Sequence, residues 1–171
     1  MKNFALFFFI PFLFLGCFKQ DTTPLYRIGI TENGVNGIND TTLYNTSLIA
    51  PKLLGYDIEH FSTNAGGEMQ SILRVTYETR EVMLILPNKP KKGQEKLVHA
   101  IIVTSKNTKN PLGIEIGESF DGSKFTACHD KENRRICSHE RHSNIYALYK
   151  KNSEESFKLY EIVWTTDSAA L

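Results

Sequence analysis

The sequence predicts a single α+β domain that is mostly antiparallel β, arranged as one compact sheet or a small barrel-like domain with one short N-terminal helix. Three observations support this fold class. Short runs rich in β-branched and aromatic residues recur along the chain, and turn-forming residues separate them. Only one segment carries the cap residues and the leucine spacing of a helix. No repeat of about 20–50 residues occurs, and the length suits one hydrophobic core.

The chain begins with the features of an export signal. Lys2 supplies a basic start, and the 12 residues from Phe4 to Leu15 are almost wholly apolar. A membrane-spanning helix needs roughly 20 apolar residues, so this run, which also contains Pro11, is too short to span. We therefore expect a signal peptide at residues 1–16, a tether at residues 17–24, and the folded domain at residues 25–171.

The apolar run ends at Phe14-Leu15-Gly16-Cys17, where a small residue directly precedes a cysteine. This segment resembles the lipobox of bacterial lipoproteins, although Phe14 and Leu15 depart from the usual residues. The resemblance implies that Cys17 is lipidated with chains such as palmitate, and two or more chains anchor a protein stably. Inner-membrane lipoproteins often carry Asp where this chain has Phe18, so we expect the outer membrane, facing the periplasm. An ordinary secreted protein cut nearby and an uncut anchor are the alternatives.

Short amphipathic or apolar runs predict the strands, and turn chemistry separates several of them. Asn33-Gly34 and Asn36-Gly37 predict a tight loop after the first strand. Thr79-Arg80 predicts a hairpin turn, although it lacks the usual glycine. Strands are expected at residues 25–31, 56–61, 71–78, 81–86, 97–105, 144–150 and 157–165.

The helix and the longest polar loop are predicted from capping residues and charge. The helix should run through residues 48–54 and end at Gly55, and Pro51 restricts where it begins, because proline lacks an N–H donor. Residues 88–96 carry four lysines and are expected to form a solvated hairpin tip. The chain has 20 basic and 19 acidic residues, and this balance disfavours nucleic acid as a partner.

Two cysteines remain once Cys17 is lipidated. Cys128 and Cys137 are nine positions apart, and an oxidising compartment favours a disulfide between them. That bond should pin the charged loop at residues 129–135. The alternative is a metal site that also uses His129, His139 and His142, but no Cys-x₂-Cys pair is present, so we expect no metal.

No catalytic motif is present in the sequence. Gly-x-Ser-x-Gly, the P-loop and the Gly-x-Gly-x-x-Gly fingerprint are all missing. Asp57 and Glu59 should share one face of a strand, as glycosidase carboxylates can, yet such pairs are common on solvated strands. Cys128 beside His129 resembles a thiol dyad, but the second thiol favours the disulfide. We therefore expect no enzyme and no cofactor, and we assign no catalytic residue.

Seven short motifs follow one another along the mature chain: Gly34–Ile38, Leu48–Tyr56, Ser71–Val75, Val103–Ser105, Asn110–Gly117, the pair Cys128 and Cys137, and Glu161–Trp164. Their order resembles the sigma-E-regulated (RpoE-regulated) lipoproteins, a family of Gram-negative envelope lipoproteins whose domain has no known function. The resemblance implies a compact, mainly β fold and no assigned enzymatic activity. It carries over no catalytic residue. Pro51 and the lysine loop depart from the family pattern.

Two function classes remain open on this basis. The favoured class is a non-catalytic lipoprotein with a binding or scaffolding role in envelope homeostasis, whose partner would be an envelope protein, a lipid or a glycan. The alternative is a small periplasmic hydrolase or hydrolase inhibitor that uses the Cys128–Cys137 loop or the Asp57 and Glu59 strand. Trp164 is expected in the core, and its second possible use is as a rim aromatic of a groove with Tyr146, Tyr149 and Tyr160.

Overall fold

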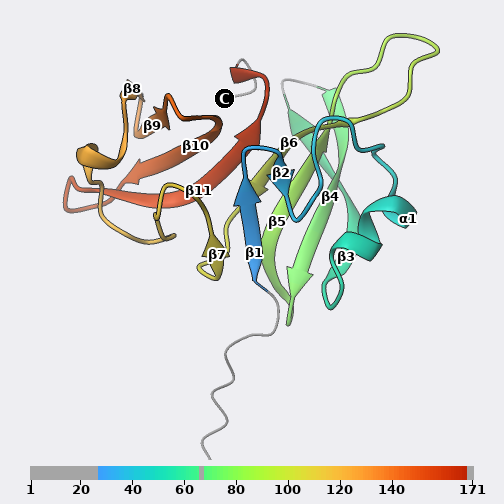
Figure 1. The fold of residues 1–171 in the computed structure, drawn as a ribbon, viewed down its shortest axis with the longest axis horizontal. Helices are drawn as coiled ribbons and strands as arrows, with labels where there is room; N and C mark the ends of the chain where they lie inside the picture. The colour runs from blue at the N-terminus through green and yellow to red at the C-terminus, as the bar shows by residue number, and fades with distance from the viewer. Residues whose placement is uncertain (1–26, 66–67, 169–171) are drawn as a thin grey trace, which may run out of the picture.

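A computed structural model describes residues 27–65 and 68–168 of the chain. The main element is an eight-stranded, wholly antiparallel sheet whose strands lie in the order β3-β4-β5-β6-β11-β10-β9-β8 (Figure 1). The order begins and ends at different strands, so the sheet is open and not a barrel. Its strands are β3 (Asp57–Ala65), β4 (Glu68–Tyr77), β5 (Arg80–Pro87), β6 (Val98–Val103), β8 (Ala127–Lys131), β9 (Arg134–His139), β10 (His142–Lys151) and β11 (Phe157–Thr165).

A second, three-stranded sheet lies against one face of the large sheet (Figure 1). It consists of β2 (Gly34–Val35), β1 (Ile28–Thr31) and β7 (Thr108–Lys109). β1 pairs with β2 in antiparallel fashion and with β7 in parallel. The prediction of a mostly antiparallel β fold with one short helix is therefore confirmed. The prediction of a single sheet is only partly right, because a second, small sheet is present.

The core lies between the two sheets. Ile28 and Ile30 of β1 pack with residues such as Leu73, Ile101 and Trp164 of the large sheet, and all five are at most 3% exposed. Successive strand residues point to opposite faces, so a second, smaller cluster forms on the other face of the large sheet. That cluster consists of Ala100, Ile136, Leu148 and Val163.

The one α-helix is shorter than the sequence predicts. α1 spans Thr46–Ile49, and the side chain of Asn45 caps it by accepting a hydrogen bond from the Ser47 N–H. The chain then tightens into the 3₁₀ helix η1 (Ala50–Lys52), with Pro51 in its first turn, where a missing N–H is tolerated. A second 3₁₀ helix, η2, spans Gly122–Lys124.

All seven predicted strands occur, with ends that differ by a few residues. Four strands were missed, namely β2, β7, β8 and β9. β2 and β7 have two residues each, too few for a repeating pattern. β8 is exposed at all five positions, so it has no apolar alternation to detect. The expectation that residues 129–135 form a charged loop is wrong, because they form most of a β8–β9 hairpin.

The turns use positive backbone angles, as two-residue hairpin turns require. Val35 and Ile38 exchange backbone hydrogen bonds across Asn36 (φ 49°) and Gly37 (φ 73°), which confirms that turn prediction. The β4–β5 turn is Glu78-Thr79, with φ of 48° and 67°, and it lies one residue earlier than predicted. Gly34 is needed for another reason, since a Cβ there would lie 2.0 Å from the Ile38 carbonyl oxygen.

Candidate functional site

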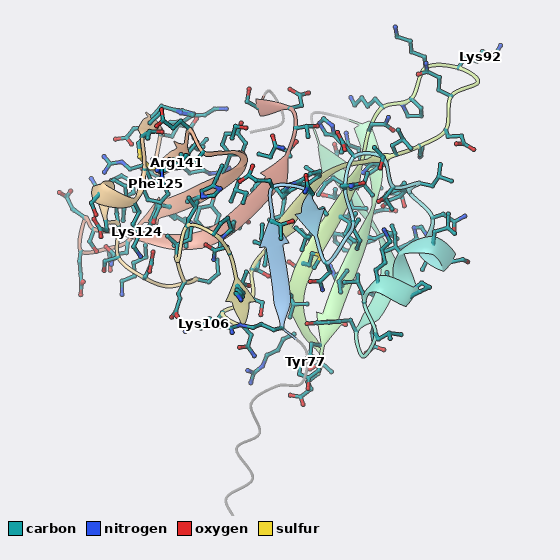
Figure 2. The ribbon with its side chains drawn as sticks, in the orientation of Figure 1. Tyr77, Lys92, Lys106, Lys124, Phe125 and Arg141 are labelled. Atoms are coloured by element: carbon teal, nitrogen blue, oxygen red, sulfur yellow. A yellow bond between two sulfur atoms is a disulfide. The ribbon has the colours of Figure 1, made fainter. Side chains whose placement is uncertain are left out.

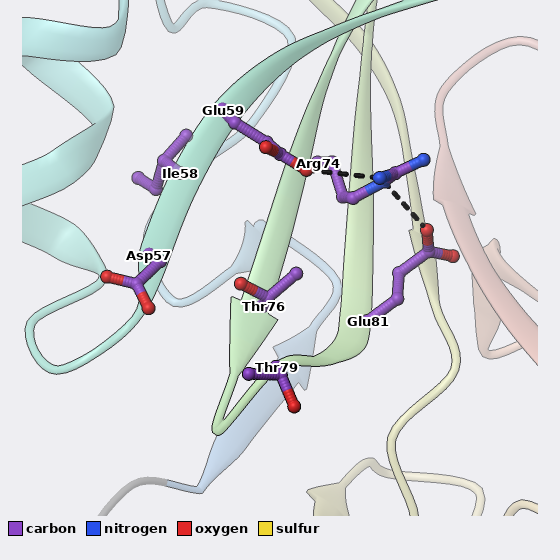
Figure 3. A pocket seen from close by; sticks show the side chains of 7 residues that line it. All are labelled: Asp57, Ile58, Glu59, Arg74, Thr76, Thr79 and Glu81. Atoms are coloured by element: carbon purple, nitrogen blue, oxygen red, sulfur yellow. Dashed lines mark hydrogen bonds and ion pairs between the residues drawn. The ribbon is translucent and has the colours of Figure 1, made fainter.

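A hollow of about 460 Å³ lies over strands β3, β4 and β5 (Figure 3). Asp57 and Glu59 both line it, so these two carboxylates lie on one face of β3, as their spacing predicts. The sequence reasoning did not find the other charged members, which come from β4 and β5. The complete lining is Asp57, Ile58, Glu59, Arg74, Thr76, Thr79 and Glu81.

Arg74 connects two of the carboxylates in this hollow (Figure 3). Its Nη1 donates to Glu59 Oε1 at 3.1 Å, and its Nε lies 3.3 Å from Glu81 Oε2. The guanidinium carbon also lies 3.9 Å from the centroid of the Phe61 ring. Strand register explains the first ion pair, because Glu59 is directly opposite Arg74 in the β3–β4 ladder.

Three carboxylates and one guanidinium line this hollow. A glycosidase pair needs one protonated and one ionised carboxyl group that face a common bond. Here Glu59 and Glu81 both face one guanidinium, that of Arg74. Two of the hollow's carboxylates are therefore engaged by one cation, an arrangement that can bind a polar ligand.

A further acidic side chain, Glu161 of β11, lies on the same face of the sheet. A bulge next to Leu148 leaves Tyr160 unpaired, and it turns Tyr160 and Glu161 toward that face. Burial raises the pKa of Glu161, and the nearby Glu81 raises it too, while Arg134 acts in the opposite direction. Burial likewise raises the pKa of Tyr160. These groups form a partly buried polar row that begins at Glu81.

The Cys128–Cys137 disulfide is present, so this prediction is confirmed. The two cysteines are directly opposite each other in the β8–β9 ladder, with 4.1 Å between their Cα atoms. The bond crosses a hairpin and does not close an irregular loop. It consumes both thiols, so a metal site that uses them and a Cys128–His129 dyad are both wrong.

Arg135 orders the same face of this hairpin as the disulfide, two residues from Cys137. It makes two hydrogen bonds to Asp130, at 2.7 and 2.8 Å, and its guanidinium lies 4.6 Å from the Phe120 ring and 4.3 Å from the Phe157 ring. The hydrogen bond from Arg135 lowers the pKa of Asp130. A planar cation held between a carboxylate and two rings is a structural clamp, which accounts for Arg135 at this position.

The histidines near the disulfide lie together without forming a metal site. The His139 and His142 rings are 5.7 Å apart, and the Arg141 N–H donates to His139 Nδ1. His142 Nδ1 lies 2.5 Å from Glu32 Oε1, just after β1. Across residues 27–65 and 68–168, no three His, Cys, Asp or Glu side chains are placed to hold a metal ion. Instead, His142 ties the small sheet to β10.

Trp164 is a core residue, as predicted. It is 1% exposed, and its Nε1–H donates to the Glu32 carbonyl oxygen at 3.1 Å. Tyr149 is also fully buried in the same cluster, whereas Tyr146 and Tyr160 pack against the smaller cluster on the opposite face. The alternative in which Trp164 and these tyrosines line one groove is therefore wrong.

A second hollow, of about 420 Å³, lies between the β4–β5 turn and the segment that follows β6. The sequence reasoning missed it, because its residues come from three separate stretches of the chain. Tyr56 and Tyr77 meet edge to face there, with ring centroids 5.8 Å apart. Its lining is Tyr56, Tyr77, Glu78, Arg80, Glu81, Val82, Thr104, Ser105, Lys106 and Asn107.

The proposed lipidation site lies outside the described residues. Cys17, the signal peptide at residues 1–16 and the tether at residues 17–24 all precede Arg27, where the description begins. Among the residues that are described, no helix has the length and apolar character needed to cross a bilayer.

Comparison with known proteins shows the fold and nothing more specific. No protein-family model matches the chain, and no curated protein matches its sequence. Among solved structures, the chain is similar to the uncharacterized protein yfeY from Escherichia coli, with a TM-score of 0.61 and 18% identity over 82% of this chain and 99% of that chain. The chain therefore shares the overall fold of a protein that is itself uncharacterized.

Proposed function

We propose that this chain is a lipid-anchored envelope protein without catalytic activity, which binds or scaffolds another envelope component. It would belong with the RpoE-regulated lipoproteins and would face the periplasm from the outer membrane. The observation that carries the proposal is Phe14-Leu15-Gly16-Cys17 at the end of an apolar leader, with Cys17 eleven residues before the start of β1. Its partner would be an envelope protein or a glycan.

Two features of the folded part support this proposal. The Cys128–Cys137 disulfide suits an oxidising compartment outside the cytoplasm. The hollow of about 460 Å³ contains Glu59 and Glu81 paired with Arg74, an arrangement that suits recognition of a polar ligand. A binding role therefore agrees with both the anchor and the charges.

Acylation and membrane address are tested together in cells. Radiolabelled palmitate should be incorporated into the wild type and not into Cys17→Ala, while Cys128→Ala with Cys137→Ala should still be labelled. Membrane fractionation should place the wild type in the outer membrane, and Phe18→Asp should move it to the inner membrane. Equal labelling of wild type and Cys17→Ala would refute the anchor.

The binding role is tested by crosslinking in intact envelopes. Wild type should capture one envelope component that withstands a moderate-salt wash, and Arg74→Gln should capture less of it, because the central cation of the hollow is lost. Lys92→Gln, in the exposed lysine loop, is the matched control and should behave as wild type. Recovery of no specific component with several crosslinkers would count against the proposal.

A further inference from the structure

One end of the domain is where the chain leaves for the anchor, and it carries a distinctive set of side chains. Arg27, the first described residue, lines a hollow of about 220 Å³ together with Lys52, Leu54 and Tyr56. Tyr56 also lines the 420 Å³ hollow, so the two hollows adjoin. We name this region the tether-end surface, made of Arg27, Lys52, Leu54, Tyr56, Arg80 and Lys106.

The sheet topology explains why these residues meet. β4 ends at Tyr77 and β5 begins at Arg80, so the β4–β5 turn lies at the end of the sheet near the start of β1. Figure 2 shows Tyr77 and Lys106 at that end and Lys92 at the opposite end. The Ile28 N–H donates to the Asn107 carbonyl oxygen, which places Lys106 beside the start of β1.

The chemistry of the tether-end surface matches the interface of an anionic membrane. Leu54 is unusually exposed for a large apolar residue, at 70% of its surface. The two hollows contain the cations of Arg27, Lys52, Arg80 and Lys106 against the carboxylates of Glu78 and Glu81, and Glu81 is already paired with Arg74. Tyrosine rings, basic residues and an exposed leucine are the side chains that suit the headgroup region of a bilayer.

The length of the tether restricts which end can approach the membrane. Ten residue steps separate Cys17 from Arg27, so the tether spans at most about 35 Å even when fully extended. A domain of about 140 residues has a radius of gyration near 14 Å, which corresponds to a diameter of about 37 Å. The far end therefore reaches the bilayer only if the tether lies stretched along the whole side of the domain.

The opposite end of the domain is the alternative docking surface, because it has a similar composition. Met69 is 71% exposed, and it lines a hollow of about 240 Å³ with Lys89, Pro90 and Lys96 of the lysine loop. Composition alone does not separate the two ends. The position of Arg27 distinguishes the two ends, since the anchor holds the tether-end surface close to the lipid.

We infer that the tether-end surface docks on the anionic face of the bilayer that holds the acylated Cys17. This inference rests on the proposed anchor. Docking places Leu54 and Tyr56 among the headgroups and sets Arg80 and Lys106 against lipid phosphates. The opposite end of the domain, including the lysine loop, then points away from the membrane.

The test uses the mature, acylated protein in vesicles of phosphatidylethanolamine and phosphatidylglycerol. Leu54→Cys and, as its matched control, Met69→Cys each receive an environment-sensitive fluorophore. The native cysteines do not react, because Cys17 is acylated and Cys128 and Cys137 are bonded to each other. We expect acrylamide to quench the label at position 54 roughly three-fold less than the label at position 69, because the bilayer interface shields the first label.

Charge variants test whether the tether-end surface binds the membrane or only lies near it. Arg80→Gln with Lys106→Gln should lower the docked-to-undocked ratio roughly five-fold per residue, because a basic residue near an anionic surface is worth about that factor. Lys91→Gln with Lys92→Gln removes the same charge from the far end and should change nothing. Vesicles of phosphatidylcholine alone should abolish the difference between the labels at positions 54 and 69.

Vesicle flotation distinguishes a failed anchor from a failed surface. If the protein floats at high salt but the position 54 label is quenched as strongly as the position 69 label, the docking inference is overturned and the anchor stands. Protection of the position 69 label instead overturns it as well. Flotation only at low salt, with position 54 protected, supports the surface and refutes the anchor. No flotation at either salt overturns both.

Discussion

Tyr149 shows how one buried hydroxyl affects the core. The residue is fully buried, and its hydroxyl has no hydrogen-bond partner within the described part of the chain. Burial, and after it Glu118 and Asp121, raise the pKa of Tyr149, so the hydroxyl remains neutral. Its ring meets Phe120 and Phe125 edge to face, with centroids 5.2 and 5.9 Å away. The ring contacts therefore stabilise the core, whereas the buried hydroxyl destabilises it.

Tyr149→Phe should stabilise the protein by about 1 kcal/mol. The substitution keeps the ring contacts and removes a buried, unsatisfied polar atom, whose cost is about 1–3 kcal/mol. Urea unfolding measures the change in the free energy of unfolding. Tyr146→Phe, on the other face of β10, is the control and should have almost no effect. A loss of stability in Tyr149→Phe would show that the hydroxyl has a partner.

Glu161 predicts a pH dependence of stability. Burial raises its pKa in the folded state, so the folded protein binds more protons than the unfolded chain between the ordinary glutamate pKa and the raised value. Stability therefore falls as pH rises through that window, and the loss persists above it. Glu161→Gln should be more stable than wild type near neutral pH, and the difference should shrink toward pH 4.

Urea unfolding at several pH values between about 4 and 7.5 measures this effect. Glu154→Gln, in the exposed β10–β11 turn, provides a matched control and should leave the wild-type profile unchanged. If Glu161→Gln has the same pH profile as wild type, the carboxyl group has no raised pKa in the folded protein.

At the scale of elements, the β8–β9 hairpin depends on its disulfide more than on burial. Every residue of β8 is exposed, so Ala127–Lys131 gains little from the hydrophobic effect. Replacing Cys128 and Cys137 together by alanine should lower the free energy of unfolding by about 2.5–3 kcal/mol, the value expected for a closed loop of about ten residues. Urea unfolding of the double variant measures this loss.

Amide hydrogen exchange locates where the hairpin loosens. In the Cys128→Ala, Cys137→Ala variant, β8 should exchange faster, whereas β9 should stay protected because it still pairs with β10. The single variant Cys128→Ala, which leaves one free thiol, should behave like the double variant. Equal exchange from β8 with and without the disulfide would contradict the prediction.

The same elements show what the sequence reveals about this fold. Alternating apolar residues predicted β4, β5 and β10, because each buries one or both faces. β8 and β9 were missed because most of their residues are polar or charged, although the disulfide that joins them was predicted. The Arg135 clamp and the pairing of β9 with β10 depend on contacts between strands, which composition does not encode.

The hollow with Asp57 and Glu59 was only half predictable for a related reason. Period-two alternation put these two carboxylates on one face. Arg74 and Glu81 join them through the β3–β4 and β4–β5 registers, and a shift beside Val75 alters the second register. An irregularity of this kind leaves no mark in the sequence, so the ion pairs that decide the chemistry were missed.

At the scale of the whole molecule, the strand order joins distant parts of the sequence into one folding unit. β11, at the end of the described chain, lies in the middle of the large sheet between β6 and β10. Glu32, just after β1, accepts hydrogen bonds from Trp164 and Asn144 and pairs with His142. The small sheet is therefore tied to β10 and β11 and shares its core with β4 and β6.

This interlocking predicts that both sheets unfold together. The protein has a single tryptophan, Trp164, so its fluorescence reports the centre of the large sheet, while far-ultraviolet circular dichroism reports all strands. The two urea transitions should coincide in wild type.

Ile30→Ala, in β1, should shift both transitions to lower urea by the same amount. The expected loss in the free energy of unfolding is about 2–4 kcal/mol, because Ile30 is 3% exposed in the shared core. Ile116→Ala, whose side chain lies at the core periphery, should cost less and shift both probes equally. If Ile30→Ala shifted part of the dichroism transition to lower urea and left the fluorescence transition in place, the small sheet would be an independent unit, and the link through Glu32 would not couple it to Trp164.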